Sequence, residues 1–149
     1  KDKDIFKYLT DYVLKVPHFF TNQSMPGTSF FYESPLDPYN PFHDLLFAKF
    51  CCIYNPNKSV LVLDRMYLNI QHIGMTGTYH RDDGDVTGLV FIRGSGSFEI
   101  KGETEFEFVP NRLIIFDAKK VHRGHPPVGN DPRITLAIKV LWSALIHHP

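Results

Sequence analysis

The hydrophobic residues of this chain follow a helical period near its start and a strand period over most of the rest. Ile5, Leu9 and Val13 recur every four positions, which predicts one face of an amphipathic helix over residues 4–16. A second helical pattern covers residues 41–54 and begins with a proline, whose fixed backbone angle suits the first position of a helix. The sequence therefore predicts two helices in its N-terminal part.

The segment between these helices, residues 17–41, has no clear period. It is rich in Pro, Ser, Asn and Gly and holds several aromatic residues, so we expect a long loop. Loops of this length in compact domains are commonly functional. The aromatic residues between positions 19 and 39 are therefore candidates to cover the entrance of a binding site.

From residue 59 onward the period is two, which is typical of β-strands. Turn signals such as GSG, KGE, VPN and GND separate the predicted strands, and we interpret GSG, residues 94–96, as a hairpin turn. The predicted strands cover residues 60–72, 86–93, 96–101, 104–109, 112–117 and 133–142. Short strands at regular spacing after two helices favour an α+β fold whose main unit is a sandwich or jelly roll, with the N-terminal helices packed on the sheet.

Two of the predicted strands each have an apolar face and a polar face. Because side chains alternate between the faces of a strand, RMYLNIQ places Asn69 and Gln71 opposite its aliphatic residues. In RITLAIKV, the polar face carries Arg133, Thr135 and Lys139. A polar face ordinarily meets water, but two such strands in a chain with a cluster of histidines favour a polar pocket inside a barrel-like sandwich.

Length and composition indicate an ordinary globular domain. The chain has 149 residues, of which 43% are hydrophobic and 21% charged, and this is enough to bury a single core. We expect one domain over residues 1–149, with a helical N-terminal part, 1–58, and a jelly-roll core, 59–142. Sixteen basic residues balance sixteen acidic ones, so the net charge favours neither nucleic acid nor a membrane surface as a partner.

The cysteines and the apolar stretches indicate in which cellular compartment the protein functions. Cys51 and Cys52, the only cysteines, are adjacent in a predicted helix, where neighbouring side chains diverge and a mutual disulfide is disfavoured. A chain without a disulfide framework suits a reducing compartment. Its apolar stretches are shorter than the ~20 residues that a membrane helix needs. We therefore expect a cytoplasmic protein that does not insert into membranes.

The stretch YHRDDG contains the residues that bear most directly on function. In an extended backbone, His80 and Asp82 project to the same side and Arg81 projects away. A metal ion needs a further ligand, which either His122 or His125 can supply. Two imidazoles and one carboxylate form the facial triad typical of non-haem Fe(II) sites, and manganese and zinc accept the same donors. The sequence therefore predicts a metal site.

With residues further along the chain, this motif resembles the signature of the iron(II) and 2-oxoglutarate dependent oxygenases, particularly those similar to prolyl 4-hydroxylases. That signature is HxD, then a distant histidine, then an Arg or Lys in a motif such as RxS or RxT. The matching residues here are His80, Asp82, His122, Arg133 and Thr135, with ten residues between His122 and Arg133. That spacing favours His122 over His125. Upstream, NIQHIG resembles the family's NxYxxG, with Gln71 where tyrosine is common, and the whole resemblance covers residues 60–142.

The resemblance implies a double-stranded β-helix in which His80, Asp82 and His122 hold Fe(II) as the catalytic centre. Members of this family use O2 and the cosubstrate 2-oxoglutarate to hydroxylate an unactivated C–H bond, with release of succinate and CO2. Ascorbate is a candidate further cofactor. Similarity to prolyl hydroxylases favours a prolyl residue of a peptide or protein as the substrate.

The resemblance also assigns cosubstrate-binding residues. Arg133 would hold the 5-carboxylate of 2-oxoglutarate, because a guanidinium can bind a carboxylate through two hydrogen bonds. Thr135 would donate a further hydrogen bond to the same carboxylate. Asn69 and Gln71 would bind the cosubstrate from the neighbouring strand, and Lys139 would reach its inner end.

Two other functions fit parts of the pattern. The set Asn69, Gln71, Arg133 and Thr135 is also similar to residues of oxygenases that demethylate alkylated nucleic-acid bases, but the balanced charge disfavours nucleic acid as a partner. A cupin-like protein that binds a metal and a sugar or small acid, without redox chemistry, would be an alternative from another class.

Overall fold

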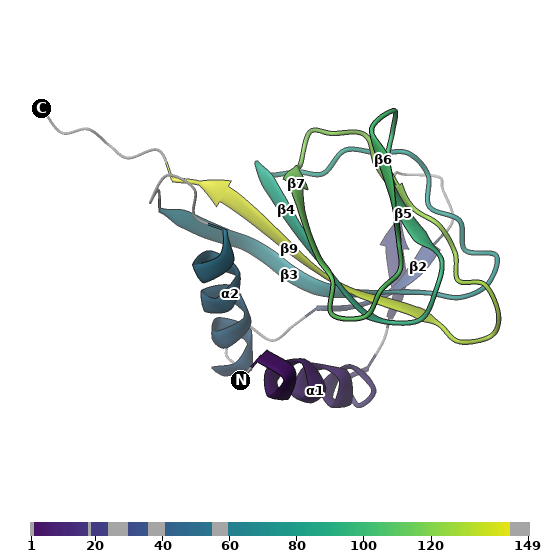
Figure 1. Cartoon of the computed structure of the whole chain (residues 1–149), viewed down its shortest axis with the longest axis horizontal. Helices are drawn as coiled ribbons and strands as arrows, with labels where there is room; N and C mark the ends of the chain where they lie inside the picture. The colour runs from purple at the N-terminus through teal and green to yellow at the C-terminus, as the bar shows by residue number, and fades with distance from the viewer. Residues whose placement is uncertain (1, 18, 24–29, 36–40, 55–59, 144–149) are drawn as a thin grey trace, which may run out of the picture.

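The computed structural model describes residues 2–17, 19–23, 30–35, 41–54 and 60–143 (Figure 1). Helices and strands follow the predicted order closely from residue 41 onward. The elements are α1 (Asp2–Val13), β1 (Phe19–Gln23), β2 (Phe30–Pro35), α2 (Pro41–Ile53), β3 (Leu61–Gln71), β4 (Val86–Arg93), β5 (Ser97–Ile100), β6 (Thr104–Glu107), β7 (Leu113–Asp117), β8 (His122–Gly124) and β9 (Arg133–Trp142).

The strands form two antiparallel sheets. The large sheet has the strand order β1-β2-β3-β9-β4-β7, and the small sheet has the order β6-β5-β8. Long strands β3 and β9 are neighbours, and their register places Asn69 opposite Thr135 and Gln71 opposite Arg133. Two antiparallel sheets whose strands follow this order form the predicted double-stranded β-helix, with helices at its N-terminal side.

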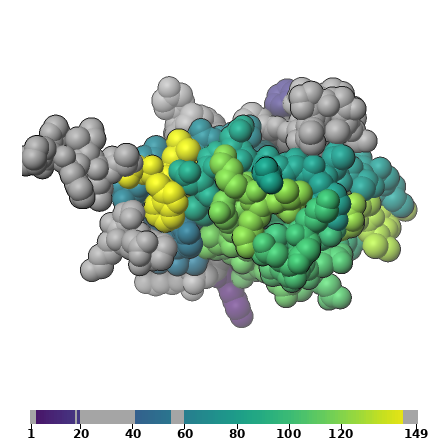
Figure 2. All heavy atoms as spheres, turned by 90° about the horizontal axis from the view of Figure 1, so that it is seen from above, coloured from purple at the N-terminus to yellow at the C-terminus, as the bar shows by residue number. Residues whose placement is uncertain are grey.

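The helices pack on one face of the large sheet, and the small sheet lies on the other side (Figure 1). The core between helices and sheet joins residues of α1 and α2 to the aliphatic faces of β3, β4 and β9. Gly88 makes this contact possible, because a methyl group at this position would lie 2.5 Å from the ring of Phe50 on α2. In the view from above (Figure 2), the strands in teal to yellow form most of the visible described surface, and little of α1 is seen.

A second core lies between the two sheets. It is built mainly from aromatic and aliphatic side chains of β4, β5 and β7. Its buried members are Tyr67, Leu89, Phe91, Phe98, Ile100, Ile114, Phe116 and Ala137. Because alternate residues of β4 enter different cores, both faces of this strand are buried and its sequence reads as a nearly continuous apolar run.

The expectation of a long loop over residues 17–41 is wrong, because this segment contains β1 and β2. These strands pair with each other, and β2 pairs with β3 at the edge of the large sheet. The edge of β3 offers unpaired backbone groups, so pairing there does not depend on a strong local strand pattern. Of the aromatic residues between positions 19 and 39 that were predicted to cover an entrance, Phe19 is exposed on β1. The structure does not describe the side chains of the others.

The interpretation of residues 94–96 as a hairpin turn is also wrong. Strand β4 before them belongs to the large sheet and β5 after them to the small sheet, so this turn carries the chain from one sheet to the other. Gly94 has a φ of 115°, and a methyl group there would lie 2.6 Å from the Cα of Arg133. Glycines are required for this close approach and this backbone angle, but they do not indicate which strands pair.

Both cysteines are free, Cys51 half-buried and Cys52 exposed. Among the described residues, no helix is long and apolar enough to span a membrane.

Candidate metal centre

A cavity of about 220 Å³ lies between the two sheets, and most of the site residues predicted from the sequence line it. This volume is below the ~300–1,000 Å³ typical of pockets for drug-sized ligands. The polar faces of β3 and β9 form one wall of this cavity. The rest of the wall includes residues of the segment after position 77 and of strand β8. The lining includes Asn69, Gln71, His80, Asp82, His122, Arg133, Thr135 and Lys139.

Backbone pairing brings the two histidines together although 42 positions separate them in the sequence. The amide of His80 donates to the carbonyl of His122 at 3.0 Å, and the amide of His122 donates to the carbonyl of His80 at 2.9 Å. The amide of Asp82 donates to the carbonyl of Ala118 at 2.9 Å. The short strand β8, which the sequence did not predict, is therefore the element that places His122 beside the HxD motif.

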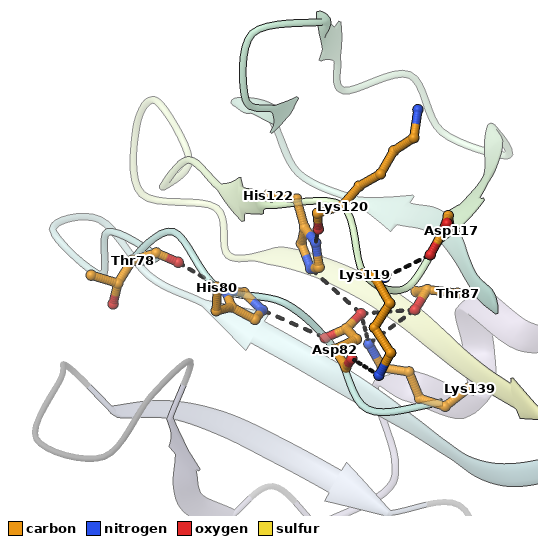
Figure 3. Close-up of polar contacts among 9 residues, drawn as sticks. All are labelled: Thr78, His80, Asp82, Thr87, Asp117, Lys119, Lys120, His122 and Lys139. Atoms are coloured by element: carbon orange, nitrogen blue, oxygen red, sulfur yellow. Dashed lines mark hydrogen bonds and ion pairs between the residues drawn. The ribbon is translucent and has the colours of Figure 1, made fainter. Parts of the chain in front are cut away.

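The three side chains converge on one point (Figure 3). One ligand atom from each of His80, Asp82 and His122 lies within 4.8 Å of the others. The Nε2 atom of His80 lies 3.6 Å from Oδ1 of Asp82, and the Nε2 atom of His122 lies 3.4 Å from Oδ2. Arg81, between the two motif residues, is exposed and also lines the cavity.

Hydrogen bonds to the backbone orient both imidazole rings. The Nδ1 atom of His80 lies 2.8 Å from the carbonyl oxygen of Thr78, and the Nδ1 atom of His122 lies 2.8 Å from that of Lys120. A carbonyl oxygen only accepts, so each Nδ1 carries a proton, and a ring in its neutral form presents the lone pair of Nε2. Two such lone pairs and a carboxylate that face one another are the donors that a metal ion binds, so the donor set fits a metal ion.

The electrostatics agree with a site for a cation. Burial lowers the pKa of His80, and this favours the neutral ring that a metal ligand requires. Burial alone would raise the pKa of Asp82, but His122 and the positive charge of Lys139 hold it well below its usual range. Asp82 is therefore a carboxylate at neutral pH.

Two further side chains contact the Asp82 carboxylate. The hydroxyl of Thr87, on β4, donates to Oδ2 at 2.8 Å, and the Nζ of Lys139 donates to the same oxygen (Figure 3). Burial lowers the pKa of Lys139, and the neighbouring carboxylate opposes this shift. In the structure, Lys139 thus contacts the candidate metal ligand, and whether it also reaches a cosubstrate stays a prediction.

Arg133 occupies a separate part of the cavity wall and is almost fully buried, with 3% of its surface exposed. Its Nη1 donates to Oε1 of Gln71, while Nε and Nη2 have no hydrogen-bond partner among the described residues. The guanidinium also lies over the rings of Phe91 and Phe108, at 5.7 and 5.8 Å from their centroids. Burial lowers the pKa of Arg133 to about 10, so it remains a cation at neutral pH.

Unpaired donors on a buried cation are costly, and a carboxylate could satisfy them. Gly124 leaves space around this group, because a methyl group at that position would lie 2.7 Å from Nη1 of Arg133 and 3.0 Å from Oε1 of Gln71. Gln71 also donates to the carbonyl of Met75 at 3.0 Å. Its amide therefore holds Arg133 in place. The direct contact of Gln71 with a cosubstrate stays a prediction.

His125, the alternative third ligand, lies outside the cavity. Its Nε2 is 3.1 Å from Oε2 of Glu99, which also accepts a hydrogen bond from Nε of Arg123 at 2.9 Å. The hydroxyl of Tyr79 donates to the other oxygen of Glu99 at 2.6 Å. This cluster is partly exposed and ties the segment before His80 to β5 and β8.

The sequence analysis did not identify Thr87, Gly124 or the two phenylalanines beside Arg133. The alternation of β4 places Thr87 on the same face as Leu89 and Phe91, so a polar residue in that apolar run was a usable signal. The role of Gly124 had no local signal, because it depends on the approach of β9 from the other sheet.

No protein-family model matches the sequence, and no curated protein matches it significantly. Solved structures do match. HygX from Streptomyces hygroscopicus, with nickel and 2-oxoglutarate bound, has a TM-score of 0.73 over 95% of this chain and 79% of its own, at 10% identity. The viral collagen prolyl hydroxylase vCPH from Paramecium Bursaria Chlorella virus-1, as a 2-oxoglutarate complex, has a TM-score of 0.63 at 15% identity, covering 74% of this chain and 78% of its own.

A third similar structure comes from a different functional class. It is a predicted oxalate decarboxylase from Thermotoga maritima, with a TM-score of 0.57 and 13% identity over 87% of this chain and 95% of its own. At such identities the likeness establishes the fold alone, because one fold supports many functions. Function therefore has to be argued from the cavity.

Proposed function

We propose that this protein is an Fe(II)- and 2-oxoglutarate-dependent dioxygenase that hydroxylates a C–H bond. One observation carries the proposal. A single cavity contains both a convergent His-Asp-His set and a buried arginine with unpaired donors. A protein that only bound a metal would need the first group and not the second.

The charge of the cavity supports an anionic ligand. Four basic side chains and two carboxylates line it: Arg65, Arg81, Arg133 and Lys139, with Asp82 and Asp83. A divalent metal ion would add to this excess of positive charge. 2-Oxoglutarate is a dianion, so one of its carboxylates can meet the metal and the other the guanidinium of Arg133.

The residues would divide the work as follows. His80 and His122 would coordinate the ion through Nε2, and Asp82 through a carboxylate oxygen. Arg133, held by Gln71, would bind the distal carboxylate through the donors that are unpaired in this structure. With Fe(II) and 2-oxoglutarate bound, the site would supply the oxidising chemistry of C–H hydroxylation, with succinate and CO2 as coproducts. The protein orients the ligands and excludes water between two packed sheets.

Thr135 and Asn69 would complete the cosubstrate site. Both line the cavity and face each other across β9 and β3, and Thr135 is two positions from Arg133 on the same strand face. Lys139, beside Asp82, would lie near the metal-binding end of the cosubstrate.

As substrate we propose a prolyl residue of a peptide or protein. The motif residues resemble those of prolyl 4-hydroxylases, and one similar structure is a viral collagen prolyl hydroxylase. A cupin-like protein that binds a metal and a small acid is the second candidate function, and the likeness to the Thermotoga maritima protein favours it.

Anaerobic addition of Fe(II) and 2-oxoglutarate to the metal-free protein tests the proposal. We expect a weak visible charge-transfer band that appears only when both are present. Fe(II) binding without this band would contradict the oxygenase and support the cupin-like alternative. Coupled succinate release with proline peptides, free proline and methylated DNA would then test the substrate, and stimulation by DNA alone would contradict the prolyl proposal.

A further inference from the structure

The two carboxylate oxygens of Asp82 have different hydrogen-bond partners. Oδ2 accepts hydrogen bonds from two donors, the hydroxyl of Thr87 at 2.8 Å and the ammonium of Lys139. Oδ2 also lies 3.4 Å from Nε2 of His122. Oδ1 lies 3.6 Å from Nε2 of His80 and accepts no hydrogen bond from the described residues. Figure 3 shows Thr87 and Lys139 approaching the same side of Asp82.

A carboxylate oxygen has two lone pairs in its plane, so two donors occupy Oδ2 fully and leave the lone pairs of Oδ1 available. We infer that Thr87 is a positioning residue that makes Asp82 a monodentate ligand through Oδ1. Thr87 is not one of the three candidate metal ligands. It acts through Asp82, and this inference rests on the metal site of the proposed function.

Thr87 suits this role better than a flexible donor would. It is almost fully buried, with 1% of its surface exposed, and a β-branched side chain has few rotamers in a strand. Its strand, β4, is hydrogen-bonded on both sides, to β7 and β9. The hydroxyl therefore has a fixed direction, and it can hold the carboxylate before a metal ion arrives.

A monodentate Asp82 also has a chemical consequence. Two histidines and one carboxylate oxygen use three coordination positions of an octahedral ion and leave three open. A bidentate carboxylate would take one of these, and fewer would remain for a chelating cosubstrate and O2. Thr87 would thus keep the coordination sphere open.

The test is a titration of the metal-free protein with Co(II), followed by visible absorption, without 2-oxoglutarate. Thr87→Val removes the hydroxyl at nearly constant shape, and Thr87→Ser keeps it. We expect Thr87→Val to bind Co(II) ~10-fold more weakly or worse, with an altered spectrum, because loss of such outer contacts typically costs 10–100-fold in metal affinity. We expect Thr87→Ser to restore both the affinity and the wild-type spectrum.

Thr10→Val is the control, because it also removes a threonine hydroxyl, but one on α1 that donates to the carbonyl of Phe6 outside the cavity. Its Co(II) affinity should equal that of the wild type. Wild-type affinity and spectrum in Thr87→Val would overturn the inference and leave the metal site intact. A wild-type protein that binds no Co(II) would overturn the metal site itself. Thr87→Ala, which also lacks the hydroxyl, gives a second measurement should Thr87→Val not fold.

Discussion

Where residues 66–71 of β3 pair with β9, both faces of the two strands are largely buried, yet the faces have opposite chemistry. One face packs aliphatic residues such as Leu68 and Leu136 against the helices. The other carries Gln71, Arg133 and Lys139 into the cavity between the sheets, and these side chains are as inaccessible as their aliphatic neighbours. Apolar burial stabilises the fold, whereas burial of charged groups with incomplete hydrogen bonding opposes it. The proposed function accounts for the polar face, because a bound anion would satisfy the unpaired donors of Arg133.

The largest expected effect is the loss of catalysis when the polar face loses a metal ligand. His80→Ala removes one of the three metal ligands, and we expect succinate formation to fall to the level measured without protein. His125→Ala is the control, because that histidine lies outside the cavity in contact with Glu99, and it should retain activity. Full turnover by His80→Ala would exclude its assignment as a ligand.

The apolar face should determine stability. Leu136→Ala creates a cavity at a residue with no exposed surface, and such changes cost ~2–5 kcal/mol in the free energy of unfolding. Urea denaturation measures this loss. The folded variant should bind Co(II) as the wild type does, because Leu136 projects away from the cavity. A loss of metal affinity without loss of stability would mean that the two faces are not separate.

Arg133→Met should have the opposite effect to Leu136→Ala and stabilise the ligand-free protein. It removes a buried cation with two unpaired donors, so the ligand-free protein should gain ~1 kcal/mol in its free energy of unfolding. The same change should weaken 2-oxoglutarate binding ~10- to 100-fold, because charge-assisted hydrogen bonds are lost. Calorimetric titration of the metal-loaded protein measures the affinity.

Arg93→Met is the control for this pair of measurements. Arg93 is partly exposed and pairs with Asp131 at 3.4 Å near the surface. Its loss should therefore change neither the free energy of unfolding nor the affinity for 2-oxoglutarate appreciably. Unchanged 2-oxoglutarate affinity in Arg133→Met would remove the main support for the cosubstrate site.

These two faces could be predicted from the sequence because alternation in a strand is a local property. His80 and Asp82 were identified for the same reason, since two positions in an extended backbone share a side. The pairing of His80 with His122 through β8, the passage of residues 94–96 between sheets and the strands β1 and β2 could not be derived in this way. The first two depend on backbone partners far away in the sequence, and the strands β1 and β2 join the sheet through the distant β3. Thr87 is intermediate, because its face was predictable but its contact with Asp82 was not.

The cluster of polar side chains around Glu99, on the outside of the small sheet, differs from both buried faces because it is partly exposed to water. Hydrogen bonds from Tyr79, His125 and Arg123 lower the pKa of Glu99 to about 2, against an ordinary value of 4.5. A group whose pKa is lower in the folded state stabilises the fold above the unfolded value, and this contribution declines as pH falls from 4.5 toward 2.

Glu99→Gln should therefore have the smallest effect of the series and a defined pH dependence. The variant should be less stable than the wild type at pH 7, and the difference should shrink between pH 4.5 and pH 2, because protonation of Glu99 makes the wild type resemble the variant. Urea denaturation at several pH values measures this difference. Exposed ion pairs contribute little, so a loss as large as that of Leu136→Ala would show that this cluster positions the segment carrying His80. A difference independent of pH would show that the ionised carboxylate of Glu99 contributes nothing to stability.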